Sequence, residues 1–263
     1  MLLIIAGRPR SGTTILQTLC DRHPDITMTN EFGSFMYTEQ KFGKHALNIF
    51  KRWQRVQGKW AFEYSYVNST KPLSWLNLMF AMKYLFYLGR NCWSGGVMVD
   101  SIEAAYEDLF PAARVKGDKL PHYLLHMEKL ASLDGLKRLV IFRDCRDVTS
   151  SFLKQVRTTW IGASWTHQFD TAEKIATSWV RDIKIMEAYA DKLLIVQYEK
   201  LMLQPAQELS RISAWLNVDP QGFPIELFRT NSIGKYQDGL TTAELNAVLE
   251  IAGPTMLRLG YIF

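Results

Sequence analysis

The residues with the clearest chemical potential form a short basic loop near the start of the chain. It reads Gly7-Arg-Pro-Arg-Ser-Gly12-Thr-Thr14, follows the apolar run 2–6 and precedes apolar residues at helical spacing. Backbone N–H groups in such a loop, together with the positive end of the following helix, bind phosphate-like anions. The loop therefore predicts an anion site, with these residues as candidate ligands: Arg8, Pro9, Arg10, Ser11, Gly12, Thr13 and Thr14.

One position separates this loop from that of nucleoside triphosphatases. The spacing of Gly7 and Gly12 fits the pattern G-x-x-x-x-G-K-[ST], but Thr13 stands where the lysine belongs. The cation comes earlier, as Arg10. We therefore expect an anionic 5′ group to bind without the lysine that holds the β- and γ-phosphates. A P-loop kinase acting on a nucleotide or a small molecule is the alternative.

A second basic motif follows another apolar run, 137–143. Arg143 at the carboxyl end of a strand can donate two N–H groups to one phosphate, and Ser151 lies eight residues further on. Taken alone, the motif could equally be a surface ion-pair cluster. Together with the first loop it places two phosphate sites at two strand ends, as a 3′,5′-bisphosphorylated nucleotide requires.

The two motifs resemble those of sulfotransferases that use 3′-phosphoadenosine 5′-phosphosulfate (PAPS). Arg10-Ser-Gly-Thr-Thr14 resembles their 5′-phosphosulfate loop. Arg143-x-x-x-Asp147-x-x-x-Ser151 resembles their 3′-phosphate motif, in which the aspartate is structural. The resemblance implies transfer of a sulfuryl group from PAPS to a hydroxyl of a peptide tyrosine, carbohydrate, lipid or small molecule. Adenosine 3′,5′-bisphosphate (PAP) would be the product.

Two later segments extend the resemblance. Tyr198-Glu-Lys-Leu is similar to a segment of tyrosylprotein sulfotransferases whose tyrosine contacts the nucleotide. Asn231-Ser-Ile-Gly-Lys235-Tyr is similar to a turn that closes over the nucleotide, which makes Ser232 and Lys235 candidate ligands.

The catalytic residues implied by the resemblance also follow the tyrosylprotein branch. Lys119 stands where small-molecule sulfotransferases carry a histidine, and it would stabilise the sulfuryl oxygens together with Arg10. Glu31 follows Arg10 by 21 residues, the spacing of the catalytic glutamate of that branch, and is the candidate general base. A capping or ion-paired carboxylate is the alternative role for Glu31, and Asp118 is the second candidate base.

Apolar runs that alternate with helical patterns predict an α/β fold with a P-loop-like central parallel sheet flanked by helices. Strands are expected at 2–6, 26–28, 97–100, 113–118, 137–143 and 193–198. Helices are expected at about 38–56, 73–89, 121–130, 147–156, 169–190 and 204–216. Thr241 and Glu244 form a capping-box pattern for a last helix that Pro254 should kink or restart.

We expect residues 1–263 to form a single sulfotransferase domain in which residues 32–112 are a helical, aromatic-rich insertion that binds the acceptor. Its aromatic residues could instead simply pack on each other. They include Phe32, Phe35, Tyr37, Trp53, Trp60, Tyr64, Tyr66, Trp75, Phe80, Tyr84, Phe86, Tyr87 and Trp93.

Composition limits the remaining function classes. The net charge of +5 suits an anionic ligand but is too diffuse to predict nucleic-acid binding. No apolar run reaches the length of a membrane span, and the three cysteines lack the spacing of a disulfide framework, which favours a cytoplasmic enzyme. No residue set has metal-ligand spacing, so no metal is expected. A nucleotide-binding scaffold without catalysis is a further alternative.

Overall fold

The computed structural model describes residues 1–55, 73–92, 96–228 and 230–262. Its centre is a parallel sheet in the order β2-β3-β1-β4-β5. The five strands are β1 (Leu2–Gly7), β2 (Ile26–Asn30), β3 (Val115–Lys119), β4 (Leu136–Phe142) and β5 (Leu194–Gln197). The predicted α/β fold with a P-loop-like parallel sheet is therefore confirmed.

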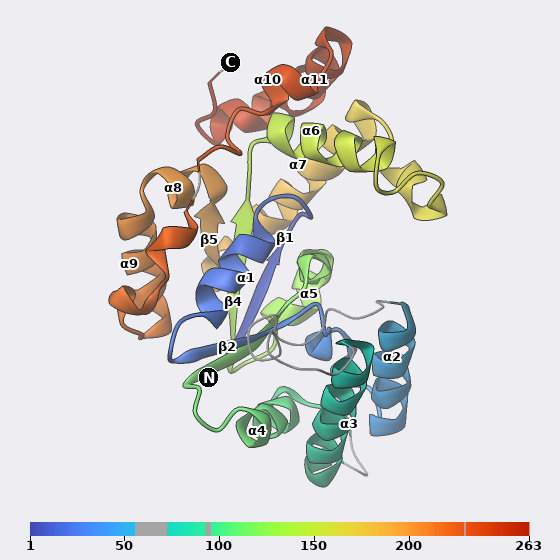
Figure 1. Ribbon diagram of the computed structural model, residues 1–263, viewed down its shortest axis with the longest axis vertical. Helices are drawn as coiled ribbons and strands as arrows, with labels where there is room; N and C mark the ends of the chain where they lie inside the picture. Colours follow the sequence, from blue (N-terminus) through green and yellow to red (C-terminus); the bar gives the residue numbers. More distant parts are fainter. Residues whose placement is uncertain (56–72, 93–95, 229, 263) are drawn as a thin grey trace.

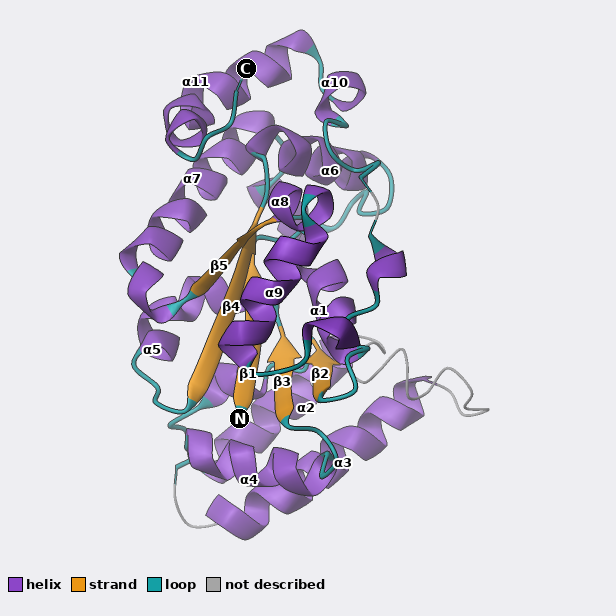
Figure 2. Ribbon diagram, turned by 90° about the vertical axis from the view of Figure 1, so that its left-hand side faces the viewer, coloured by secondary structure: helices purple, strands orange, loops and turns teal. Residues whose placement is uncertain are grey.

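Both faces of the sheet are buried, which explains why the central strand β1 reads as an unbroken apolar run. Leu2, Ile4 and Ala6 point into one core, and Leu3 and Ile5 point into the other. Figure 2 shows the sheet between two helical layers. One layer contains α1 (Thr13–Asp21), α8 (Tyr198–Leu203) and α9 (Pro205–Leu216), and the other contains α5 (Met127–Ala131) and α7 (Ala172–Ala188).

The order of the strands fixes where a ligand can bind. The chain passes from β1 to the edge strand β2, returns through β3, and then crosses to β4 on the other side of β1. In open parallel sheets, ligands bind at the carboxyl ends of the strands where the winding direction changes. Here those ends belong to β1, β3 and β4, whose register pairs Ile5 with Lys119 and Gly7 with Ile141.

The predicted helical insertion contains α2 (Phe42–Arg55), α3 (Leu73–Cys92) and α4 (Val99–Leu109), which lie together at the opposite end of the molecule from α10 (Tyr236–Gly239) and α11 (Thr242–Arg258) (Figure 1). Many of its aromatic rings pack on each other. The ring centroid of Phe32 lies 5.0 Å from that of Phe80 and 4.9 Å from that of Tyr84. Trp60, Tyr64, Tyr66, Trp93 and the side chain of Trp53 lie outside the described part of the chain.

One predicted strand is wrong. Val97 and Val99 are buried while Met98 is half exposed, an alternation that mimics a strand. The segment instead leads into α4, because Ile102, Ala105 and Tyr106 continue the buried set at helical spacing. Met98 is only the extended residue before the helix.

Two other helix predictions need adjustment. The expected helix at 121–130 is a 3-10 helix, η2 (Pro121–His126), followed by α5. The capping box of Thr241 and Glu244 is present, but α11 continues through Pro254 without restarting.

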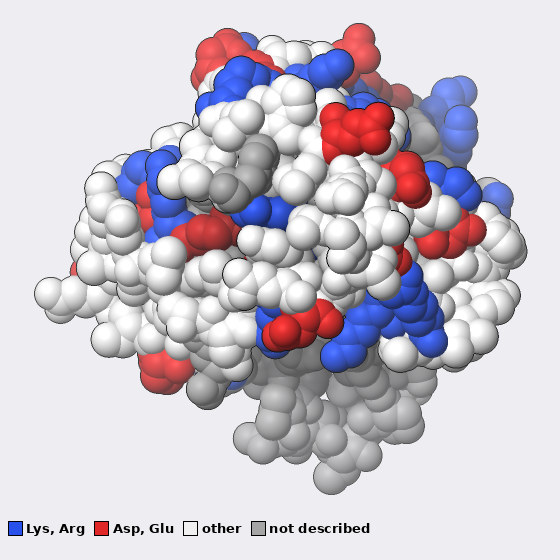
Figure 3. All heavy atoms as spheres, turned by 90° about the horizontal axis from the view of Figure 1, so that it is seen from above, with Lys and Arg blue, Asp and Glu red and all other residues white. Residues whose placement is uncertain are grey.

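The surface at the carboxyl ends of the strands carries mixed charge. Seen from that end, Lys and Arg form several separate groups interspersed with Asp and Glu, rather than one continuous basic face (Figure 3). Within the ranges described above, no helix combines the length and the hydropathy needed to cross a membrane.

Candidate active site

Every strand of the sheet delivers one predicted site residue at its carboxyl end. β1 leads into the loop 7–12, β2 into Glu31, β4 into Arg143 and β5 into Tyr198, while Lys119 is the last residue of β3. Parallel pairing brings all five ends to the same edge. The fold thus gathers residues that lie far apart in the sequence.

The first loop and the Arg143 motif line one cavity of about 390 Å³. Arg10 Nε donates a 2.8 Å hydrogen bond to Ser151 Oγ across this cavity, which joins the loop to α6 (Cys145–Arg157). Burial, followed by the nearby charge of Arg143, lowers the pKa of Arg10. The cavity is lined by Arg10, Gly12, Thr13, Thr14, Ile15, Thr18, Arg143, Ser151 and Tyr198.

Two glycines allow the loop to turn tightly beneath this cavity. Gly12 has a φ of 96°, and a Cβ placed on it would lie 2.5 Å from Cδ2 of Tyr198. Gly7 has a φ of 148°, and its Cβ would lie 2.3 Å from the backbone oxygen of Ile141. Arg10 also has a positive φ of 72°. The loop therefore needs glycine both for conformation and for close approach.

Arg143 is held from three sides. Its guanidinium lies 4.7 Å from the ring centroid of Tyr198 and forms an ion pair of 3.1 Å with Asp147. Its Nη2 donates to the backbone oxygen of Ser232. Its Nε is buried and has no hydrogen-bond partner among the described residues. The same is true of Oγ of Ser11 in the loop. Two buried polar atoms near one cavity are therefore left for a ligand.

Asp147 anchors the C-terminal turn to α6. Its carboxylate accepts hydrogen bonds from the backbone N–H groups of Gly234, at 2.9 Å, and Tyr236, at 3.0 Å. This arrangement brings Ser232 to Arg143 through its backbone. Lys235 lies in the same turn with an exposed side chain and is not among the residues that line the cavity.

Glu31 and Lys119 form an ion pair, with Lys119 Nζ 3.0 Å from Oε1 of Glu31. The lysine is almost fully buried, whereas 39 % of the glutamate side chain is exposed. The backbone N–H of Glu31 donates to the oxygen of Lys119 at 2.6 Å. Both candidate catalytic side chains are therefore held together by adjoining strand ends.

Asp118, the second candidate base, points the other way. It is completely buried and is not among the residues that line either cavity described here. Its carboxylate accepts hydrogen bonds from Thr29, Phe32, Gly33 and Tyr123. It cannot reach a ligand in this arrangement, because its lone pairs are occupied within the protein.

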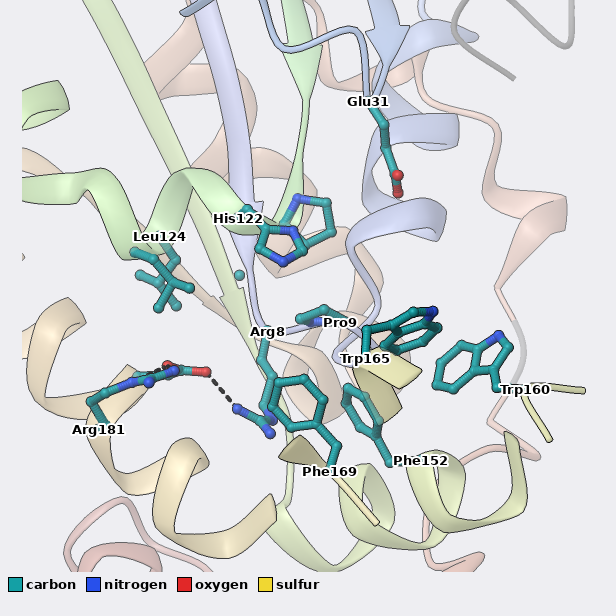
Figure 4. A pocket seen from close by; sticks show the side chains of 14 residues that line it. Arg8, Pro9, Glu31, His122, Leu124, Phe152, Trp160, Trp165, Phe169 and Arg181 are labelled. Carbon is teal, nitrogen blue, oxygen red and sulfur yellow. Dashed lines mark hydrogen bonds and ion pairs between the residues drawn. The ribbon is translucent and has the colours of Figure 1, made fainter. Parts of the chain in front are cut away.

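A second cavity, of about 300 Å³, lies on the other side of the first loop. Figure 4 shows Glu31 at one end of it and a group of aromatic rings at the other. Pro9 lines this cavity and the next residue, Arg10, lines the first one. The loop is therefore the wall between two cavities. The aromatic group is Phe152, Trp160, Trp165 and Phe169.

Arg8 belongs to this second cavity and not to the first. Its guanidinium donates 2.7 Å and 2.6 Å hydrogen bonds to Asp182 and Ser178, and lies over the rings of Phe152 and Phe169. Burial lowers the pKa of Arg8, while Asp182 acts in the opposite direction. The side chains of Arg8 and Pro9, predicted as nucleotide ligands, thus lie at the second cavity and not at the first.

Sequence reasoning missed most of the wall of this second cavity. His122 lines the cavity, and burial is the main cause of its lowered pKa. The aromatic cluster between α6 and α7 was not singled out either. The available signal was Trp160, Trp165 and Phe169 within ten residues that lack helical spacing.

The predicted acceptor region, 32–112, is not part of the second cavity as far as the structure describes it. The residues that line the second cavity come from segments 7–9, 31, 121–125 and 152–182, so the described part of 32–112 adds none. Across the described residues, no group of three or more His, Cys, Asp and Glu is arranged to hold a metal ion.

Comparison with known proteins identifies the family. The sulfotransferase family profile matches residues 3–221. Protein-tyrosine sulfotransferase A of Caenorhabditis elegans is 23 % identical over 221 residues, which cover 82 % of this chain and 50 % of that protein. Nodulation protein NoeE of Sinorhizobium fredii is 24 % identical over 310 residues, covering 99 % and 66 %. The chain thus spans half of the first relative and about two thirds of the second.

Solved structures share the fold. The sulfotransferase domain of the Synechococcus PCC 7002 olefin synthase has a TM-score of 0.60 at 18 % identity and covers 100 % of this chain and 95 % of that one. A mouse sulfotransferase complexed with PAP has a TM-score of 0.51 at 14 % identity and covers 97 % and 84 %. The family match covers most of the chain and decides against the P-loop kinase interpretation. This protein belongs to the sulfotransferase family.

Proposed function

We propose that this protein transfers a sulfuryl group from PAPS to a hydroxyl of an acceptor bound in the second cavity. The observation that carries the proposal is that Arg10 and Arg143, from two strand ends, line one cavity and are linked through Ser151. A nucleotide with phosphate groups at both its 3′ and 5′ positions needs two such cationic sites. The family match supports the same donor.

The residues of the first cavity fit this donor. The buried and unpartnered Nε of Arg143 and Oγ of Ser11, both within the described residues, are donors that a phosphate oxygen would satisfy. The loop ending at Gly12 and the start of α1 would hold the 5′ end, and Arg143 with Ser151 the 3′-phosphate. The ring of Tyr198 lines the cavity and packs against the guanidinium of Arg143. Ser232 and Lys235 complete the proposed ligands from the C-terminal turn.

When bound, the donor supplies a sulfuryl group activated by its link to phosphate. Glu31 takes the proton of the acceptor hydroxyl, since its carboxylate is partly exposed in the second cavity. Lys119 and Arg10 favour the negative charge that develops during transfer. The ion pair with Lys119 also fixes the direction of the Glu31 side chain.

The walls of the second cavity indicate the chemistry of the acceptor. Phe152, Trp160, Trp165 and Phe169 offer a planar, apolar lining, and Glu31 and His122 bring polar atoms to it. A sugar would leave most of its hydroxyl groups unpaired there, which costs binding energy. A carboxylate base also suits a phenol, whose pKa is about 10, better than an alkyl alcohol. We therefore propose a phenolic hydroxyl as the acceptor.

A phenolic hydroxyl can belong to a free phenol or to a tyrosine side chain. The Caenorhabditis elegans relative is named for protein tyrosine, which supports the second source. The possible role of the insertion 32–112 in acceptor binding stays a prediction. Residues 56–72 of it lie outside the described part of the chain.

The test is a transfer assay with radiolabelled PAPS and three acceptors: 2-naphthol, a tyrosine peptide and a chitin oligosaccharide. We expect transfer to naphthol, to the peptide or to both, and none above background to the sugar. Preferred transfer to the sugar would overturn the phenolic acceptor. Tight PAP binding without transfer to any acceptor would favour the non-catalytic scaffold. Glu31→Gln should lower turnover by about 100-fold or more while PAP affinity stays unchanged.

A further inference from the structure

Asp118 is a buried carboxylate without a role in the reaction proposed above, but its hydrogen bonds hold the segment that carries Glu31. It accepts a 2.6 Å hydrogen bond from the hydroxyl of Thr29, on one side of Glu31. On the other side it accepts bonds of 3.0 Å and 2.8 Å from the backbone N–H groups of Phe32 and Gly33. Three of its bonds therefore bracket the candidate base.

The fourth bond comes from Tyr123, in η2. Its hydroxyl lies 2.5 Å from Asp118 and also accepts a 3.3 Å hydrogen bond from the N–H of Phe35. Because the tyrosine hydroxyl has one hydrogen, that hydrogen is free to point at Asp118. The hydroxyl of Tyr123 thus links Asp118 to the segment that follows Glu31.

The backbone of Glu31 needs such support. Its φ is +61°, a left-handed conformation that residues with a Cβ disfavour. Two further bonds hold the same residue: its N–H donates to Lys119 at 2.6 Å, and Arg52 Nε donates to its oxygen at 2.7 Å. A disfavoured turn of this kind persists only where its surroundings fix it.

The turn is built to receive an anion. Successive backbone N–H groups of Phe32 and Gly33 converge on one carboxylate, as in anion-binding turns. Burial raises the pKa of Asp118, and its hydrogen bonds from Thr29, Tyr123 and Gly33 act in the opposite direction. An uncharged amide in its place would turn an N–H₂ group toward two of the four donors.

We infer that Asp118 is a positioning residue: it holds the turn 31–33 so that the carboxylate of Glu31 points into the second cavity. The inference rests on the proposed role of Glu31 as base. When the hydrogen bonds of Asp118 are weakened, the turn samples other conformations. The fraction of molecules in which Glu31 points into the second cavity then falls. Turnover should fall with it, whereas the nucleotide cavity should be untouched.

Two variants test the inference. Asp118→Asn should lower kcat by about 10- to 100-fold, because it removes hydrogen bonds to a charged acceptor. Tyr123→Phe removes one donor and keeps the volume, so it should lower kcat by about fivefold to tenfold and remains informative if Asp118→Asn fails to fold. PAP affinity, measured by calorimetry, should stay within twofold in both. Normal kcat in folded Tyr123→Phe would contradict the inference.

A double-variant cycle separates positioning from general stability. If Asp118 acts through Glu31, adding Tyr123→Phe to Glu31→Gln should cause no further loss of the residual turnover. Losses that multiply would show that the network acts elsewhere and would overturn the inference.

Hydrogen exchange supplies a readout that does not need activity. The amides of Phe32 and Gly33 should exchange about fivefold to tenfold faster in Tyr123→Phe than in the wild type. Asp21→Asn is the matched control, because Asp21 accepts a hydrogen bond from the backbone N–H of Met28, in the middle of β2 and outside the turn 31–33. It should leave both amides and kcat unchanged.

The two proposals fail in different ways. Unchanged exchange in Tyr123→Phe overturns the positioning role of Asp118, whatever the activity. Faster exchange in Tyr123→Phe, combined with full activity in Glu31→Gln, would leave the hold of Asp118 on the turn intact. It would remove Glu31 as the proposed base.

Discussion

Arg10 and Ser151 are 141 positions apart in the sequence, yet Nε of the arginine donates a 2.8 Å hydrogen bond to the serine hydroxyl. The bond joins the loop after β1 to the helix after β4. Two motifs that the sequence presents separately therefore form a single cavity. The distance between the two proposed phosphate sites is set by the neighbouring positions of β1 and β4 in the sheet.

The first prediction concerns the arginine at the end of β4. Arg143→Lys should weaken PAP binding by about 10- to 100-fold, because lysine can neither lie over Tyr198 in the same way nor donate two parallel N–H groups. Calorimetric titration with PAP measures the change. Arg138→Lys is the control, since Arg138 is equally buried near the start of the same strand. Equal losses in both variants would point to damage to β4 and not to a lost ligand.

The second prediction uses two glycines with similar strain but different surroundings. Gly12→Ala should displace the ring of Tyr198 and cost about 1–3 kcal/mol of stability, together with PAP affinity. Gly135→Ala has a comparable positive φ of 73° but no atom within 4 Å of the added Cβ. It should cost about 1 kcal/mol and leave PAP affinity unchanged. Thermal unfolding and PAP titration of both variants separate contact from strain.

The sequence was sufficient to predict the five strands of the sheet and the glycine-flanked loop that joins β1 to α1. Leu2 to Ala6 are apolar on both faces because both faces are buried, and Gly7 and Gly12 mark where the backbone must approach Ile141 and Tyr198. Such features are local, so residue types alone reveal them. The strand expected at 97–100 is absent, and the prediction failed because three residues of alternation cannot distinguish a strand from the residues before a helix.

The second cavity could not be predicted in the same way. Arg8 lies next to the nucleotide loop in sequence, but its side chain turns toward Asp182, which comes from α7. Only the packing of α6 and α7 against the sheet determines that direction. The burial of Asp118 and the partial exposure of Glu31 likewise depend on packing, because Asp118 lies within β3 and Glu31 lies in the turn after β2.

The third prediction tests the proposed acceptor wall. Trp165→Ala should raise the KM for a phenolic acceptor by about 5- to 30-fold through lost apolar and aromatic contact, with PAP affinity unchanged. Initial rates at saturating PAPS measure the effect. Trp215→Ala is the control, because Trp215 packs against Lys137 and is not among the residues that line the cavity. A loss of kcat alone, without a rise in KM, would contradict the assignment of Trp165 to acceptor binding.

The fourth prediction concerns stability in acid and involves His45. This histidine is fully buried, and burial lowers its pKa to about 4 from an ordinary value of 6.5. One ring nitrogen lies 3.0 Å from the oxygen of Tyr37 and the other 3.1 Å from the hydroxyl of Tyr84, which suits the neutral ring. Below pH 6.5 the unfolded chain therefore takes up a proton that the folded protein does not.

The sign of the pH effect follows from proton counting. Between about pH 6.5 and pH 4 the unfolded state binds more protons at His45 than the folded state does, so stability falls as the pH falls through this window. Below pH 4 both states are protonated and the contribution is constant. The shift corresponds to about 3 kcal/mol over the window. His45→Gln removes the titration, so the stability difference between wild type and variant should shrink by this amount from pH 7 to pH 4. Urea unfolding at four pH values measures it, and parallel pH curves for the two proteins would show that His45 titrates alike in the folded and unfolded states.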